Sequence, residues 1–180
     1  EAPNKKIYVT NSGDGTVSVY QGADLQQIGR IDVGGTPHGL RSAADGSVIV
    51  IADPVTGTVE LIDPGTDQVT GSIAVGSGPA QVAVSSDGRY AYTGTTEPPA
   101  VVKVDLTSRT VVGSVAVPTA PVQLYLTPDE STVISADQGT REAAGHTVSL
   151  IDTTAMTLLR AVSTGAGPHG VVIDPTGTHA

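Results

Sequence analysis

The chain has 180 residues and a formal net charge of −9, from 9 basic and 18 acidic residues. Its length and its 38% hydrophobic residues indicate one folded domain with a core. The acidic charge argues against nucleic acid as a main partner, and the lack of Cys excludes disulfides, thiolate zinc sites and cysteine nucleophiles. No apolar run approaches the ~20 residues that cross a bilayer, so no membrane span is predicted.

A sequence repeat organises the whole chain. A Pro that precedes a short apolar strand recurs at intervals of 42, 42 and 47 residues, in Pro37-His38, Pro79-Ala80, Pro121-Val122 and Pro168-His169. A turn marker keeps the same interval of 42 residues, in Asp45-Gly46, Asp87-Gly88 and Asp129-Glu130. Independent markers in phase predict successive copies of one supersecondary unit.

Each unit is predicted to contain four short strands. In the second repeat they are Gly39–Ala43, Ser47–Asp53, Thr58–Asp63 and Val69–Val75. These segments are rich in Val, Ile and Thr and are bounded by Gly, Asp, Pro or Ser, which is typical of strands and turns. In chain order the repeats cover about 5–35, 36–77, 78–119 and 120–166, and 167–180 begins a further one.

The chain is predicted to open on the second strand of a unit, around Lys5–Asn11, and to end after a first strand at Gly170–Asp174. No segment shows the period of 3.6 residues that marks a helix. Four antiparallel strands in every 40 to 45 residues are typical of a β-propeller blade. We therefore predict an all-β propeller of four-stranded antiparallel blades, with four blades' worth of strands.

The segments Tyr8-Val9-Thr10-Asn11, Gly15–Val19, Thr36–Gly39 and Gly167–Gly170 carry a resemblance to a known family. They resemble the YVTN repeat family of β-propellers, and the resemblance covers essentially the whole chain. Members of that family serve as surface-layer modules, periplasmic binding proteins and parts of redox enzymes. The resemblance thus implies a fold far more firmly than a function.

Three arrangements of the ring stay open. The family's usual ring of about seven blades favours a piece of a longer chain, truncated at the C-terminus. A closed ring of four blades is the second arrangement, and two chains joined into a ring of eight blades is the third. The partner needed to complete the ring is accordingly either the remaining blades or a second chain.

We expect a ligand site at the end of the propeller where each first strand begins, which we call the top face. The longer fourth interval places an insertion, Gln138–His146, in a loop at this face, where it is a candidate binding element or a tolerated surface insertion. The candidate residues for a small-molecule or protein ligand are His38, His169, Arg141, Glu142, His146, Asp53 and Asp137.

His38 and His169 are candidate ligands for a metal or for the edge of a haem. They share one position in two repeats, three units apart. The alternative is that Pro-His-Gly is a favoured turn whose His bonds to backbone groups. For Asp53 and Asp137, bonding to the following turn competes with a ligand role. Lys103 replaces the aliphatic residue of the other repeats, so it either extends to solvent or lines a site.

Three functional hypotheses follow. The first is a non-catalytic, ligand- or protein-binding scaffold without a cofactor, periplasmic or extracellular, for which Glu1 fits the start of an exported chain. The second is a redox-associated propeller that holds haem or copper through His38 and His169. The third is a lactonase-like hydrolase, although no pair of general base and electrophile can be assigned to it.

Overall fold

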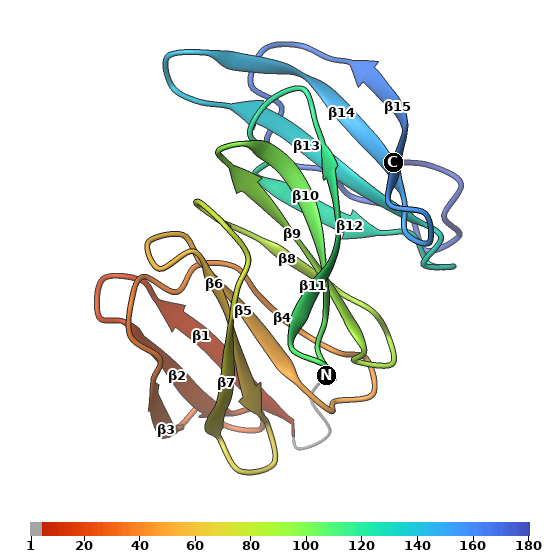
Figure 1. Ribbon diagram of the computed structural model, residues 1–180. Helices are drawn as coiled ribbons and strands as arrows, with labels where there is room; N and C mark the ends of the chain where they lie inside the picture. The colour runs from red at the N-terminus through yellow and green to blue at the C-terminus, as the bar shows by residue number, and fades with distance from the viewer. Residues whose placement is uncertain (1–4) are drawn as a thin grey trace.

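The computed structural model describes residues 5–180, so Glu1 lies outside the described residues. Within this range the chain forms fifteen strands and no helix, and no helix is therefore available to cross a membrane. The strands form one three-stranded and three four-stranded antiparallel sheets, stacked face to face along an arc (Figure 1). The prediction of an all-β fold with four-stranded propeller blades is confirmed.

Each sheet is one blade, numbered here from the N-terminus. Blade 1 contains β1 (Lys6–Asn11), β2 (Thr16–Gln21) and β3 (Gln27–Asp32), and blade 2 contains β4 (Leu40–Ser42), β5 (Ile49–Asp53), β6 (Thr58–Asp63) and β7 (Gln68–Ala74). Blade 3 contains β8 (Val82–Val84), β9 (Tyr90–Thr96), β10 (Pro99–Asp105) and β11 (Thr110–Ala116). Blade 4 contains β12 (Gln123–Leu126), β13 (Thr132–Gly139), β14 (Ala144–Asp152) and β15 (Thr157–Ser163).

The turn between the first and second strands of blades 2, 3 and 4 is built from the predicted Asp marker. The Ser47 N–H donates to the Asp45 carboxylate at 2.9 Å, and Asp87 and Asp129 accept from the same position of their own turns. Hydrogen bonds from neighbouring hydroxyl groups hold the pKa of all three carboxyls below its usual value. The marker therefore closes hairpins.

The hydrophobic core is divided into three layers, each between two successive blades. The layer between blades 1 and 2 contains the buried side chains of Val17, Val19, Ile31, Ile49, Ile51 and Ile62. The next layer joins blades 2 and 3 around Val59, Leu61 and Val82, and the third joins blades 3 and 4 around Leu124 and Ile151. Stacking of neighbouring blades thus buries the apolar side chains that a single sheet would leave exposed to solvent.

The outward face of blade 1 carries apolar side chains that other repeats bury. Ile7 and Val9 are 42% and 43% exposed, whereas Ile49 and Ile51, one repeat further on, are 1% and 0% exposed. On the opposite end of the arc, Ile134, Val148, Leu150 and Val162 line a hollow of about 460 Å³ that residues 170–172 partly cover. Both end faces therefore carry apolar side chains like those that pack between neighbouring blades inside the arc.

The strand predicted at Gly170–Asp174 does not form, and this part of the prediction is wrong. A first strand pairs with the second strand of its own blade, and β1 pairs only with β2. Residues 170–172 lie instead against blade 4, where the Val171 N–H donates to Gln123 Oε1 at 3.3 Å. The chain consequently does not close into a ring of four blades.

Candidate functional site

The hydrogen bonds at the ends of the blades define the top face. In each blade the end of the fourth-position strand bonds to the hairpin between the second and third strands. The bonds are Val33 N to Gly15 O, Val75 N to Gly57 O, Val117 N to Pro99 O and Thr164 N to His146 O. These bonds place the hairpins between the second and third strands beside the linkers that leave the fourth strands. His38 and His169 lie in two of those linkers.

His38 is held by the beginning of the next blade. Its Nδ1 lies 2.9 Å from the carbonyl oxygen of Ala80, and the Gly39 N–H donates to the same oxygen at 2.9 Å. Ala80 occupies the position of His38 one repeat later. Because a carbonyl only accepts, Nδ1 carries the proton, and Nε2 of the neutral ring keeps its lone pair. The ring is exposed, so Nε2 is available to a ligand.

Gly39 is required for this arrangement. A Cβ at this position would lie 2.6 Å from both the Ala80 carbonyl oxygen and Gln81 Cα, closer than side chains approach backbone. The Pro-His-Gly turn therefore has a structural cause, as the alternative interpretation expected. The same turn also orients the imidazole in the way that metal-bound histidines are oriented, with one nitrogen bound to a carbonyl and the other free.

His169 repeats the sequence of this turn but not its contacts. It is exposed and lies in the linker after β15. The bond made by His38 goes to a residue one repeat further on, and the equivalent of that residue for His169 would lie beyond residue 180. Within residues 5–180, no group of three or more His, Cys, Asp or Glu side chains is placed to hold a metal ion.

Asp53 is buried at the end of β5 and Asp137 is buried two residues before the end of β13, and both bond within the protein. Asp53 accepts from the backbone N–H of Thr36 at 2.7 Å and of Val55 at 2.9 Å. It therefore fixes the linker that carries His38, two residues after Thr36. Asp53 bonds to the turn that follows its strand, as the turn interpretation expected, and it acts on the site by positioning. Asp137 does not bond to the turn that follows it, because its partners lie on β13 and β14.

The Asp137 carboxylate accepts three hydroxyl hydrogen bonds. The donors are Ser135 at 2.9 Å, Thr147 at 2.8 Å and Ser149 at 2.6 Å. Burial raises the pKa of Asp137, and the three hydroxyl donors oppose that rise. This carboxylate ties β13 to β14 at the base of the insertion.

The insertion Gln138–His146 forms an extended hairpin rather than a loop. β13 and β14 continue into it with Gly139 opposite Ala144, so residues 140–143 alone form the turn. The hairpin reaches out at the upper left of Figure 1. Arg141, Glu142 and His146 are exposed, and a hollow of about 340 Å³ lies between residues 138–144 and Gly167.

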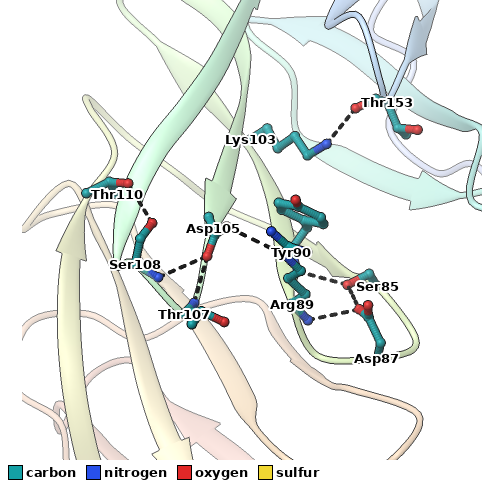
Figure 2. Close-up of polar contacts among 10 residues, drawn as sticks. All are labelled: Ser85, Asp87, Arg89, Tyr90, Lys103, Asp105, Thr107, Ser108, Thr110 and Thr153. Atoms are coloured by element: carbon teal, nitrogen blue, oxygen red, sulfur yellow. Dashed lines mark hydrogen bonds and ion pairs between the residues drawn. The ribbon is translucent and has the colours of Figure 1, made fainter.

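Lys103 joins two blades (Figure 2). Its Nζ donates to the Thr153 carbonyl of blade 4 at 2.7 Å and lies 4.1 Å from the centroid of the Tyr90 ring. Burial lowers the pKa of Lys103, and the carbonyl and the ring compensate the charge. The contacts show a structural role that neither prediction named, because the lysine spans the interface between blades 3 and 4 instead of extending to solvent.

A polar pair on the innermost strands was missed from the sequence. Arg41 of β4 donates from Nη2 to the Tyr125 hydroxyl of β12 at 3.3 Å, and its guanidinium carbon lies 5.6 Å from the Tyr125 ring centroid. Arg41 and Tyr125 occupy the same position two repeats apart. Their shared place in the repeat was the available signal.

The predicted site residues therefore separate into two groups. His38 and Asp53 lie together at the entry to blade 2, whereas Arg141, Glu142 and His146 lie on the hairpin of blade 4. The linker of His169 approaches the second group, because the Gly167 N–H donates to the Gly145 carbonyl at 2.8 Å. Both groups belong to the top face.

Blades of four antiparallel strands stacked along an arc define a β-propeller protein. Residues 3–159 match the family model described as Cytochrome D1 heme domain. The chain belongs to this family. The propeller implied by the resemblance is thereby confirmed, while membership of the YVTN repeat family in particular stays a prediction. No curated protein matches the sequence.

Two solved structures are similar in fold. Hydrazine synthase of Kuenenia stuttgartiensis is 30% identical, with a TM-score of 0.73, over 78% of this chain and 40% of that chain. Dihydro-heme d1 dehydrogenase NirN, solved in complex with DHE, is 20% identical, with a TM-score of 0.76, over 98% of this chain and 39% of that chain. The chain thus spans about two fifths of the length of either structure.

Proposed function

We propose that this chain is part of a haem-binding, redox-associated β-propeller and that His38 supplies a ligand to the haem iron. Membership of the Cytochrome D1 heme domain family favours the haem hypothesis over the non-catalytic scaffold. The single observation that carries the assignment of His38 is its ring geometry, with Nδ1 on the Ala80 carbonyl and Nε2 free.

The residues present fit a haem in their donor chemistry. The macrocycle supplies four ligands to iron, so one imidazole from the protein suffices, whereas a copper site takes several protein ligands. Bound haem would supply one-electron chemistry at its iron. The chain itself would hold the imidazole in one orientation, since the Ala80 carbonyl fixes the ring and Asp53 fixes the linker before it.

The test is a titration of the purified chain with haem, followed by absorption spectroscopy. We expect the intense haem band to shift on binding in the native protein and in His169→Ala, and to lack the imidazole-ligated form in His38→Ala. The fold should survive the latter change, because the Gly39 N–H still satisfies the Ala80 carbonyl. Identical spectra for native protein and His38→Ala would refute the iron ligand, and no binding would refute the haem function.

We also propose that the end faces of the arc contact further blades, from the rest of a longer protein or from a second chain. Support comes from the exposure of Ile7 and Val9 at positions that are buried in the following repeat. A location in the periplasm or outside the cell is proposed as well, in keeping with a Cys-free composition. Fractionation of cells that express the complete gene tests this location.

A further inference from the structure

We propose that Thr10 and Ser12 of blade 1 are positioning residues for His38, which hold its backbone so that the imidazole keeps one orientation. This inference rests on the proposed function, since it concerns the same imidazole as the proposed iron ligand. Two side-chain hydrogen bonds from blade 1 to the linker before blade 2 support it.

Both hydroxyl groups bond to carbonyls beside the Cα atom of His38. Ser12 Oγ donates to the Pro37 carbonyl at 2.5 Å, and Thr10 Oγ1 donates to the His38 carbonyl at 2.9 Å. The His38 N–H donates to the Ala52 carbonyl of blade 2 at 2.9 Å. The two peptide groups that flank the His38 Cα are therefore both held at their oxygen by blade 1.

Three blades thus meet at this histidine. Blade 1 holds the two backbone oxygens, blade 2 holds the N–H, and the Ala80 carbonyl before β8 of blade 3 lies 2.9 Å from Nδ1. The ring extends from Cα through two rotatable bonds, which occupy a small set of rotamers. With the backbone fixed at one end and Nδ1 fixed at the other, Nε2 of His38 keeps a single direction.

The repeat links the Thr10 hydroxyl to the histidine and not to blade packing in general. Thr10 stands where the other repeats have Ala52, Gly94 and Ala136, none of which has a hydroxyl. Ala136 precedes the linker of His169, so this second histidine has no equivalent support from its own blade. A side chain needed only for the packing of blades would recur in the other repeats.

The test measures haem affinity of the whole chain in single-hydroxyl variants. Thr10→Val keeps nearly the same shape, and we expect it to weaken haem binding about fivefold, whereas Thr10→Ser should restore the native affinity. Ser12→Ala should act in the same direction as Thr10→Val. Thr96→Val is the matched control, because Thr96 Oγ1 donates to the Ser77 carbonyl at 3.2 Å in a linker without His, and native affinity is expected.

A double-mutant cycle with His38→Ala separates positioning from a structural role. If Thr10 acts through the imidazole, Thr10→Val should have no further effect on haem affinity once His38 is removed. The same fivefold loss in the presence and absence of His38, or equal affinities of native protein and Thr10→Val, would overturn the proposal. Unfolding midpoints of each variant verify that the chain remains folded.

A measurement without haem separates this inference from the haem function. NMR of 15N-labelled histidine gives the share of His38 rings protonated at Nδ1, which Thr10→Val should lower and Thr96→Val should leave unchanged. If native protein binds no haem but this share falls in Thr10→Val, the haem function is refuted and the positioning stands. If the share is the same in native protein and Thr10→Val, the positioning is refuted.

Discussion

Two isoleucines at one position of the repeat provide a quantitative test of the end faces. Ile7 and Ile49 are separated by one repeat, and both lie on the second strand of their blade. Ile49 is 1% exposed within the layer between blades 1 and 2, whereas Ile7 is 42% exposed. Substitution of each by Ala removes the same three carbons from two different environments.

The expected costs follow from burial. Removing three buried carbons costs about 2.4 kcal/mol in transfer free energy, and the cavity left behind raises the loss for Ile49→Ala to about 3 kcal/mol. At Ile7 about half of the transfer cost remains and no closed cavity forms, so Ile7→Ala should lower the unfolding free energy by about 1 kcal/mol. Urea unfolding of the two variants at equal protein concentration measures the difference.

The result also depends on what covers blade 1. Equal losses in a sample whose native mass is that of one chain would refute the assignment of Ile7 to an uncovered face. If a second copy covers that face, the loss from Ile7→Ala should grow with protein concentration and approach that of Ile49→Ala. In a longer protein that contains further blades, the two losses should be alike at every concentration.

Three further predictions concern the site and its supports. Gly39→Ala should lower stability by about 1 to 3 kcal/mol in thermal unfolding because of the contact with Ala80, whereas Gly13→Ala, with open space around its Cβ, should not. Burial raises the pKa of Asp137 in the folded protein, so its contribution to the unfolding free energy is complete below the unfolded pKa and declines as pH rises through the folded pKa. The loss of unfolding free energy caused by Asp137→Asn, measured by urea unfolding, should therefore be greater at pH 3 than at pH 7. Lys103→Met should unfold within about 1 kcal/mol of the native protein, because other repeats have an aliphatic side chain there, and a loss above about 3 kcal/mol would contradict that equivalence.

The blades were predictable because the turn markers and the strand-forming segments of the sequence indicate the same strand limits. The Asp markers predict hairpins, and the strands of the second repeat are found within two residues of the predicted limits. The failed strand at Gly170–Asp174 has a different cause. Residues 170–174 include Val, Ile and Gly and have the composition of a strand, but a strand forms only beside another strand that bonds to it. β1 could have been that neighbour, yet it bonds only to β2. Local propensity does not supply that partner.

The candidate site was predicted less well, because side-chain roles depend on neighbours from other repeats. His38 and His169 stand in the same tripeptide, Pro-His-Gly, yet only His38 has its carbonyl partner one repeat later. Asp53 and Asp137 end equivalent strands, but one accepts backbone N–H groups and the other accepts hydroxyls. The repeat specifies where such residues lie in the fold and leaves open which atoms they meet.

Arg41 illustrates how the repeat can still be used to find contacts between blades. When the residues at one position of the repeat differ in polarity from blade to blade, blade packing does not determine the side chain at that position. On the innermost strands one such position holds Arg41, Ala83 and Tyr125 in successive blades. A core position would keep similar aliphatic residues, as Leu40, Val82 and Leu124 do one residue earlier. The mixture of a cation, a methyl group and a phenol thus indicates that blade packing alone does not determine the side chain at this position.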